Sequence, residues 1–393
     1  MKRLFAGIIF VAIYFGFLEV RGQSVLDSPS RHIAIFVPLY LDSVFDAGNK
    51  YRFDEIFPKF VSPGLEFYEG AQLALDTLQS QNAKLNVRIF DTHSAQRPLA
   101  TIMQSGALDS MDLIIGFANA GESRLLSVAA SHQHIPFVNI NLPNNSNITE
   151  NPDLVLLNST LRTHCEEIYR FLQRNYATTR INYLYNKSSM GQELKNYFTE
   201  VEKNTRSVPL HLRFVQLNDP LGRDQLASLM DSTRQNVFVA GSLNESFSRN
   251  LCMELASFGE SYSTTIIGMP TWDNIDFTAP EYKGLEIYYS TPFYYNQTDT
   301  LVRFIQQYFK SRFYSRPSDL VFRGYETIFH FGNLLLQYGR NLDANIREKK
   351  YSVFGDFDLE PVYSNSHTGT IDYIENKKLY FIKKVSGAIT IVY

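Results

Sequence analysis

The sequence lacks the short motifs that mark common catalytic and nucleotide-binding sites. It contains no GxxxxGK[ST] phosphate loop, no GxGxxG, no HExxH, no GxSxG and no CxxC pair. Nothing in the sequence singles out a pair of carboxylates for hydrolysis either. These absences make an enzyme the least supported class of function. They also lead us to expect no cofactor and no catalytic or metal-binding residues.

Cysteine is scarce, because Cys165 and Cys252 are the only two in 393 residues. Two cysteines do not make a disulfide-stapled scaffold. Each lies in a segment with helical spacing, and free cysteine is commonly buried, so the pattern predicts two buried thiols. A single disulfide formed after export is the alternative.

Strong charge of one sign is also missing, since the formal net charge is −3. A mildly acidic chain argues against nucleic acid, or an anionic membrane, as the main partner. Low-complexity tracts are absent and 44% of the residues are hydrophobic, which indicates a globular protein. The length exceeds one ordinary hydrophobic core and indicates two domains.

The one long apolar run lies at the N-terminus, from Leu4 to Leu18, after Lys2 and Arg3. It is short for a membrane span and typical of a secretory signal peptide, so we expect residues 1–22 to be removed after Gly22. No cysteine precedes that position, which argues against a lipoprotein anchor. The sequence therefore predicts a periplasmic or secreted protein that does not span the membrane after cleavage; an uncleaved anchor is the alternative.

Short apolar strands alternate with amphipathic helices along most of the chain. This alternation predicts an α/β fold with mostly parallel sheets covered on both faces. The pattern runs to about residue 148 and then starts again. We expect two doubly wound lobes, lobe I from 30–148 plus 293–351 and lobe II from 149–292 plus 352–393. About three crossovers would join them, near residues 147–153, 290–295 and 352–358.

The most informative stretch runs from Asp112 to Asn145. An apolar strand at 113–116 is followed by a polar loop at 117–121 and a helix, and a second strand at 135–140 ends in the polar loop 141–145. Both loops fall at the carboxyl ends of neighbouring parallel strands, where open α/β sheets bind ligands. The stretch therefore predicts a site for a small molecule.

The order of these segments resembles the type I periplasmic solute-binding proteins, in the leucine/isoleucine/valine-binding branch that serves branched-chain amino acid ABC transporters. The resemblance covers nearly all of the mature chain. It rests on the order and spacing of several segments: IAIFVPLY, GLEFYEGAQLALDTL, NVRIFDTHS, DLIIGFANAGES, IPFVNINLPNN, INYLYNKSSMGQELKNYF, NVFVAG, TTIIGMPTWDN and GYETIFHFGNLLLQYG.

In that family a small ligand lies between two lobes that close around it, and the resemblance implies which residues contact it. The implied first-lobe contacts are Asn119, Ala120, Gly121, Glu122, Ser123, Asn141, Leu142 and Asn144. The implied second-lobe contacts are Lys187, Ser188, Ser189, Met190, Ser242, Leu243, Asn244, Pro270, Thr271 and Trp272. Glu122 has a second interpretation as a charge that complements a helix dipole, and Trp272 as a residue that fills the wall between the lobes.

The chain departs from the amino-acid-binding pattern at several of these positions. The acidic group that would hold an α-ammonium aligns with Pro270, and expected tyrosines align with Met190 and with Leu243 or Asn244. A buried ammonium without a paired carboxylate is costly. The departures therefore predict that leucine, isoleucine and valine bind weakly or not at all.

Two functional hypotheses follow. The first is an exported solute-binding protein that closes on a small polar organic ligand and presents it to a membrane transporter permease. The second is an envelope-associated regulator or scaffold that uses the same fold to bind a protein or a cell-wall component.

Overall fold

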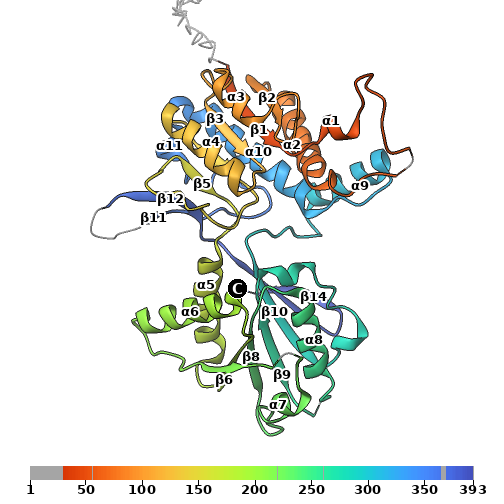
Figure 1. Cartoon of the computed structure of the whole chain (residues 1–393), viewed down its shortest axis with the longest axis vertical. Coiled ribbons are helices and arrows are strands. Elements are labelled where there is room, and N and C mark those ends of the chain that lie inside the picture. Colours follow the sequence, from red (N-terminus) through yellow and green to blue (C-terminus); the bar gives the residue numbers. More distant parts are fainter. Residues whose placement is uncertain (1–29, 55, 219, 260, 364–368, 393) are drawn as a thin grey trace, which may run out of the picture.

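The protein consists of two α/β lobes arranged one above the other (Figure 1). This computed structural model describes residues 30–54, 56–218, 220–259, 261–363 and 369–392. The expected signal peptide, residues 1–22, lies outside them. No helix within the described ranges is long and apolar enough to cross a membrane.

Lobe I is built on a seven-stranded sheet in the order β11-β12-β5-β4-β3-β1-β2. Its strands pair in parallel except for β11, which is antiparallel to β12. Strands β3 and β4 are fully buried and β1 is buried after its first two residues, as expected for a sheet covered on both faces. The bounds are β1 Arg31–Val37, β2 Leu85–Asp91, β3 Leu113–Gly116, β4 Phe137–Asn139, β5 Leu154–Leu156, β11 Leu359–Tyr363 and β12 Ile371–Asn376.

The helices of lobe I come from both ends of the chain. Two of them, α2 and α10, cross closely because Gly70 and Gly324 lie at the contact; a Cβ at Gly70 would meet the carbonyl oxygen of Val321 at 1.9 Å. The apolar faces of α9 and α10 fill the core of this lobe, as the sequence predicts. The bounds are α1 Leu41–Val44, α2 Ser62–Ser80, α3 Leu99–Gln104, α4 Ala120–Gln133, α9 Thr300–Phe313, α10 Asp319–Tyr338, η3 Gly339–Asn341 and α11 Leu342–Asn345.

Lobe II repeats the same plan with a sheet in the order β14-β13-β10-β9-β8-β6-β7. Its five strands from β6 to β10 are parallel, and β13 and β14 are antiparallel additions. The strands are β6 Ile181–Tyr185, β7 Arg213–Gln216, β8 Asn236–Gly241, β9 Thr264–Gly268, β10 Leu285–Thr291, β13 Tyr380–Val385 and β14 Ala388–Val392. The helices are α5 Leu161–Tyr176, α6 Ser189–Asn204, α7 Arg223–Ala227, α8 Glu245–Ala256, η1 Pro270–Asn274 and η2 Pro280–Tyr282.

The chain crosses between the lobes three times, at residues 157–160, 292–299 and 377–379. The second crossing overlaps the predicted range of 290–295. The first and third lie further along the chain than 147–153 and 352–358, because β5 pairs with β4 and β12 pairs with β5. Strands β5, β11 and β12 therefore join the sheet of lobe I, although the sequence places their residues in lobe II.

The two cysteines are free and fully buried, Cys165 on α5 and Cys252 on α8. Burial raises the pKa of both thiols far above their usual range, so they stay protonated. The prediction of two buried thiols is thus confirmed.

Candidate functional site

A cavity of about 560 Å³ lies between the lobes, at the carboxyl ends of strands from both sheets. Lobe I contributes the loop after β4, Arg323 of α10 and Tyr373 of β12. Lobe II contributes the first turns of α5 and α6 and the segment 270–274 after β9. Residues 158–160 of the first crossing and Pro292 of the second also line it, with Thr291 at the end of β10. Ligands of open α/β sheets bind at this end of the strands.

Five of the predicted contact residues line this cavity, Asn144 from lobe I and Met190, Leu243, Pro270 and Thr271 from lobe II. The loop that holds Asn144 also contributes Pro143 and Asn145. Side chains of the remaining predicted contacts are not part of its wall. Their positions show what they do instead.

The loop after β3 is occupied with starting helix α4. The Asn119 side chain accepts hydrogen bonds from the backbone N–H groups of Gly121 and Glu122, at 2.9 and 3.1 Å. The Glu122 carboxylate accepts one from the Asn119 N–H at 2.8 Å, which completes a capping box with Ala120 as the first helical residue. Glu122 therefore supports the helix start, which agrees with its interpretation as a complement to the helix dipole.

Three more predicted contacts are fixed by one buried amide that the sequence does not reveal. Asn139 has no exposed surface and donates to the Ser123 hydroxyl at 3.1 Å. Its side-chain oxygen accepts from the backbone N–H groups of Asn141 and Leu142. Asn139 thus shapes the loop that brings Asn144 to the cavity.

In lobe II two of the predicted polar contacts, Ser188 and Asn244, are helix caps. Ser188 caps α6 by accepting from the Gly191 N–H, beside the exposed Lys187 and Ser189. Asn244 caps α8 by accepting from the Phe247 N–H, and the Ser242 hydroxyl accepts from the Asn244 N–H. The side chains of Ser188, Ser242 and Asn244 therefore accept hydrogen bonds from the nearby backbone.

Trp272 points into the core of lobe II and has no exposed surface. Its indole packs so closely on Gly268 that a Cβ there would lie 1.9 Å from the ring, and its N–H donates to the Ser248 hydroxyl at 2.9 Å. The residue therefore supports the segment 270–274 from beneath and leaves Thr271 and Asp273 facing the cavity.

Two polar atoms in the cavity wall have no hydrogen-bond partner among the described residues. The Nε of Arg323 and the hydroxyl of Thr271 are both buried and make no hydrogen bond within the described residues. The Arg323 guanidinium lies 3.9 Å from the centre of the Phe293 ring, which fixes its plane. Unpaired polar atoms at a cavity wall are suited to meet a polar ligand, because leaving them unpaired is costly.

Charged side chains reach the cavity from both lobes, Arg323 from lobe I and Arg162, Glu193 and Asp273 from lobe II. Arg323 extends from lobe I, whereas Asp273 of lobe II accepts a hydrogen bond from the Tyr289 hydroxyl at 2.9 Å. Burial, with Asp273 adding to it, raises the pKa of Tyr289 well above its usual range, so this hydroxyl remains a donor. Sequence patterns place Asp273 near a strand end, but no pattern marks Arg323 within its helix.

A buried histidine lines the cavity beside the second crossing. The Nδ1 atom of His164 lies 2.7 Å from the Ser290 hydroxyl. Burial lowers the pKa of His164 to about 3, so the ring is neutral at physiological pH. Ser290 has no exposed surface, so this pair joins α5 to β10 and offers no accessible nucleophile.

Comparisons with known proteins agree with this architecture. No protein-family model matches the chain, and no curated protein sequence matches it. Solved structures do. The chain has the type I periplasmic binding protein fold.

One similar structure is a branched-chain amino acid ABC transporter periplasmic ligand-binding protein from Burkholderia xenovorans, with a TM-score of 0.58, 12% identity, and coverage of 93% of this chain and 95% of that one. An ABC transporter substrate-binding protein from Desulfitobacterium hafniense in complex with Leu matches with a TM-score of 0.56 and 13% identity. The match covers 93% of this chain and 100% of that one. LpoA from Haemophilus influenzae matches with a TM-score of 0.57 and 13% identity, and the match covers 93% of this chain and 59% of that one. Identities this low establish the shared fold alone, which confirms the predicted fold class.

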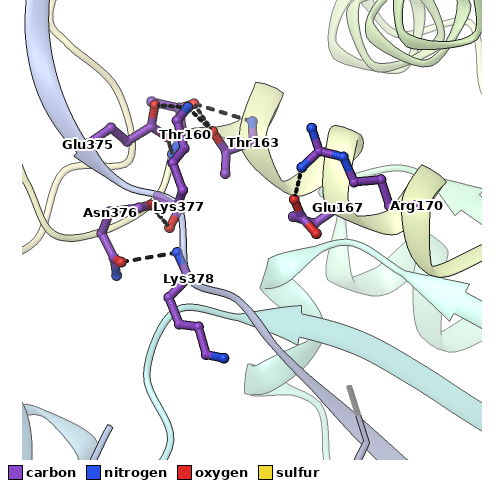
Figure 2. A network of polar contacts seen from close by, with 9 residues as sticks. Thr160, Thr163, Glu167, Arg170, Glu375, Asn376, Lys377 and Lys378 are labelled. Atoms are coloured by element: carbon purple, nitrogen blue, oxygen red, sulfur yellow. Dashed lines mark hydrogen bonds and ion pairs between the residues drawn. The ribbon is translucent and has the colours of Figure 1, made fainter. Parts of the chain in front are cut away.

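Within this type I fold, a polar network ties lobe I to the start of α5 (Figure 2). Glu375 of β12 is 1% exposed and accepts from the Thr160 N–H and the Thr163 hydroxyl, both at 2.7 Å. Lys377 donates to Glu375 at 2.6 Å and to Thr163 at 2.7 Å. A carboxylate at a helix N-terminus is favourable, so the network holds two of the three crossings together.

Proposed function

We propose that the protein is an exported solute-binding protein that closes its two lobes around a small polar organic ligand and delivers it to an ABC-type transporter. The observation that carries the proposal is the cavity of about 560 Å³ that both lobes and two crossings share. Its size falls within the usual range for small-molecule sites. Its wall offers the unpaired Nε of Arg323 and hydroxyl of Thr271.

The proposed ligand carries an anionic group for Arg323 and a hydrogen-bond donor or cation for Asp273. The arginine is a planar donor that suits a carboxylate or a phosphate. Asp273 lies three residues beyond Pro270, the position that aligns with the family's ammonium-binding acid. The aligned contacts for leucine, isoleucine and valine remain replaced, so we still expect these amino acids to bind weakly.

Native mass spectrometry of the purified chain tests this proposal. We expect a small molecule to be carried through purification and to be lost on mild unfolding. Titration calorimetry with the common amino acids then tests specificity. Micromolar binding of leucine would show that the predicted departures from the family's cleft do not matter.

A second candidate function is a scaffold or regulator of the cell envelope, in which the fold binds a protein or cell-wall partner. The observation that favours it is the occupation of the predicted polar contacts, such as Asn119 and Asn244, in capping their own helices. In this case the purified chain carries no small molecule, and the lobes keep the same separation when small solutes are added.

A further inference from the structure

A second cavity, of about 460 Å³, opens on the surface of lobe I, away from the cleft between the lobes. Ten of the eleven side chains that line it are apolar or tyrosine, among them Leu41, Phe45, Phe57 and Ile89. These four are between 37% and 48% exposed, so the apolar surface continues outside the cavity. Single exposed apolar residues are ordinary, whereas a contiguous group marks an interaction site.

The one carboxylate in this cavity, Asp91, is held by the surrounding backbone. Its two oxygens accept four backbone N–H groups, those of Leu39, Tyr40, Leu41 and His93, at 2.8 to 3.1 Å. A ligand in the cavity would therefore contact mainly aliphatic and aromatic side chains, which suits an acyl chain.

Exposed aromatic and apolar side chains surround the same corner of lobe I. Ile56 is 75% exposed and Phe60 is 46% exposed, just before α2. Phe313 is 39% and Tyr314 is 92% exposed, at the end of α9. We name these four residues, with Leu41, Phe45, Phe57 and Ile89, the corner patch.

One hydrogen bond and one electrostatic interaction place the segment that follows α9, and the end of α9 itself, near the start of α2. The Ser318 hydroxyl donates to Glu66 in the first turns of α2. Burial raises the pKa of Glu69, and Arg312 at the end of α9 opposes that shift. Figure 1 shows α9 and the loop that precedes α2 at the same end of lobe I.

Positive charge accompanies the corner patch. Residues 300–318 contain four basic residues and no acidic one. Lys310, Arg312 and Arg316 are exposed there, as is Lys59 between Phe57 and Phe60. None of these four cations forms an ion pair with any residue that the structure describes. The positive excess belongs to residues 300–318, since residues 41–69 contain six acidic and three basic residues.

We propose that the corner patch docks the protein on the surface of an anionic lipid bilayer. Exposed aromatic rings sit at the boundary between headgroups and acyl chains, and basic side chains beside them contact lipid phosphates. The apolar cavity would take an acyl chain or part of one. Lipid fits better than a protein partner, because the patch combines apolar surface with cations that have no ion-pair partner among the described residues.

Vesicle flotation of the chain from Gln23, which lacks the apolar run of residues 4–18, tests the proposal. We expect the protein to float with vesicles of phosphatidylcholine and phosphatidylglycerol in equal amounts, and not with phosphatidylcholine alone. Binding should weaken as salt is added, since the cations act through screened charge.

Two sets of variants separate the parts of the patch. The triple variant K310E/R312E/R316E should bind anionic vesicles at least about tenfold more weakly. The double variant Ile56→Ser with Tyr314→Asn should lower binding with the charges intact; asparagine suits the left-handed backbone at residue 314, where φ is 52°. The control K203E/R206E reverses two exposed cations on lobe II and should bind as the parent does. Thermal unfolding followed by circular dichroism checks that all variants fold.

Equal flotation with neutral and anionic vesicles, no flotation at all, or unchanged binding by the variants would overturn the proposal. So would binding of a polyglutamate peptide, lost in the triple variant, by a protein that does not float with vesicles. That result would assign the patch to an acidic protein partner.

Discussion

Arg323 is the residue on which the proposed ligand site depends most. It is held by the Phe293 ring on one side, and its buried Nε has no partner among the described residues. Nothing in the sequence marks it, because it lies in a helix whose other residues are largely buried core positions. From the sequence alone, a basic residue in a mostly apolar helix is expected to face solvent. Its place in the cleft becomes evident only when the second lobe is seen to lie opposite.

We predict that Arg323→Ala lowers the affinity for the co-purified ligand roughly 10- to 100-fold, since a charged hydrogen bond is lost. Titration calorimetry after removal of the ligand measures the change. Arg97→Ala is the control, because Arg97 is an exposed cation of the same lobe and does not line the cleft. Equal affinity in both variants would show that the ligand does not contact Arg323.

At the scale of elements, the attachment of α5 to β12 is the feature that determines how firmly the lobes are joined. The carboxylate of Glu375 is almost fully buried and accepts hydrogen bonds from three donors. Replacing Glu375 by the neutral glutamine would leave Lys377 without its ion-pair partner. The exposed pair of Glu167 and Arg170 on the same helix offers a matched comparison (Figure 2).

We predict that Glu375→Gln lowers the free energy of unfolding by about 1–3 kcal/mol and speeds amide exchange in the first turn of α5. Glu167→Gln should change stability by less than about 0.5 kcal/mol, because the pair is solvent-exposed. Urea unfolding and hydrogen exchange measure both. A Glu375→Gln variant as stable as the control would contradict a structural role for the network.

A second element-scale feature is the carboxylate that α10 buries beneath residues 354–355. Glu326 is 3% exposed and accepts from the Gly355 N–H at 3.0 Å. Burial raises its pKa from the usual 4.5 to about 7; Asp356 adds to the shift, and the backbone N–H groups of residues 354–355 and Arg323 oppose it. The folded protein therefore keeps a proton that the unfolded chain releases at lower pH.

It follows that the contribution of Glu326 to stability is complete below about pH 4.5 and is lost as the pH rises through about 7. We predict that Glu326→Gln, which stays neutral, loses less stability than the parent over this range, by at most about 3 kcal/mol. Urea unfolding at several pH values tests this. The exposed Glu348→Gln is the control and should follow the parent.

The strands and helices could largely be predicted from the sequence, because their periodicity is local. Their assignment to lobes could not. The strand of residues 154–156 follows a loop and precedes a helix, as the first strand of a new unit would, yet it pairs with β4. Likewise only three residues, Lys377, Lys378 and Leu379, separate β12 from β13, which is a typical length for a hairpin turn. The chain instead passes from one sheet to the other at this point. Only strand pairing distinguishes these cases.

The location of the site loops could be predicted from the sequence, whereas the orientation of their side chains could not. Strand ends locate the loops of Asn144 and Thr271 correctly, since the carboxyl edge of a parallel sheet is fixed by chain direction. Whether a polar side chain in such a loop faces the cleft or caps its own helix depends on backbone geometry. Asn119, Ser188 and Asn244 all cap helices, and their residue types suit either role.

For the whole molecule, three crossings and the Glu375 network are the connections that a change in lobe separation must accommodate. Short connecting segments between two rigid cores are typical of hinges. We predict that small-angle scattering shows a smaller radius of gyration when the co-purified ligand is added back to the stripped protein. The Arg323→Ala variant at the same ligand concentration is the control. An unchanged radius at saturating ligand would favour the scaffold hypothesis.

The matching strand orders of the two lobes have a consequence for how a ligand is oriented. β4 and β9 hold the same position in their sheets, and each is followed by a loop with a proline that enters the cleft, at Pro143 and Pro270. The cleft is thus bounded by two related edges facing each other in approximate internal symmetry. A symmetric cleft would accept a ligand in either direction. The two loops differ in charge, because the first carries the neutral Asn144 and Asn145 whereas the second carries Asp273. We therefore expect the basic end of a dipolar ligand to face the loop of Asp273.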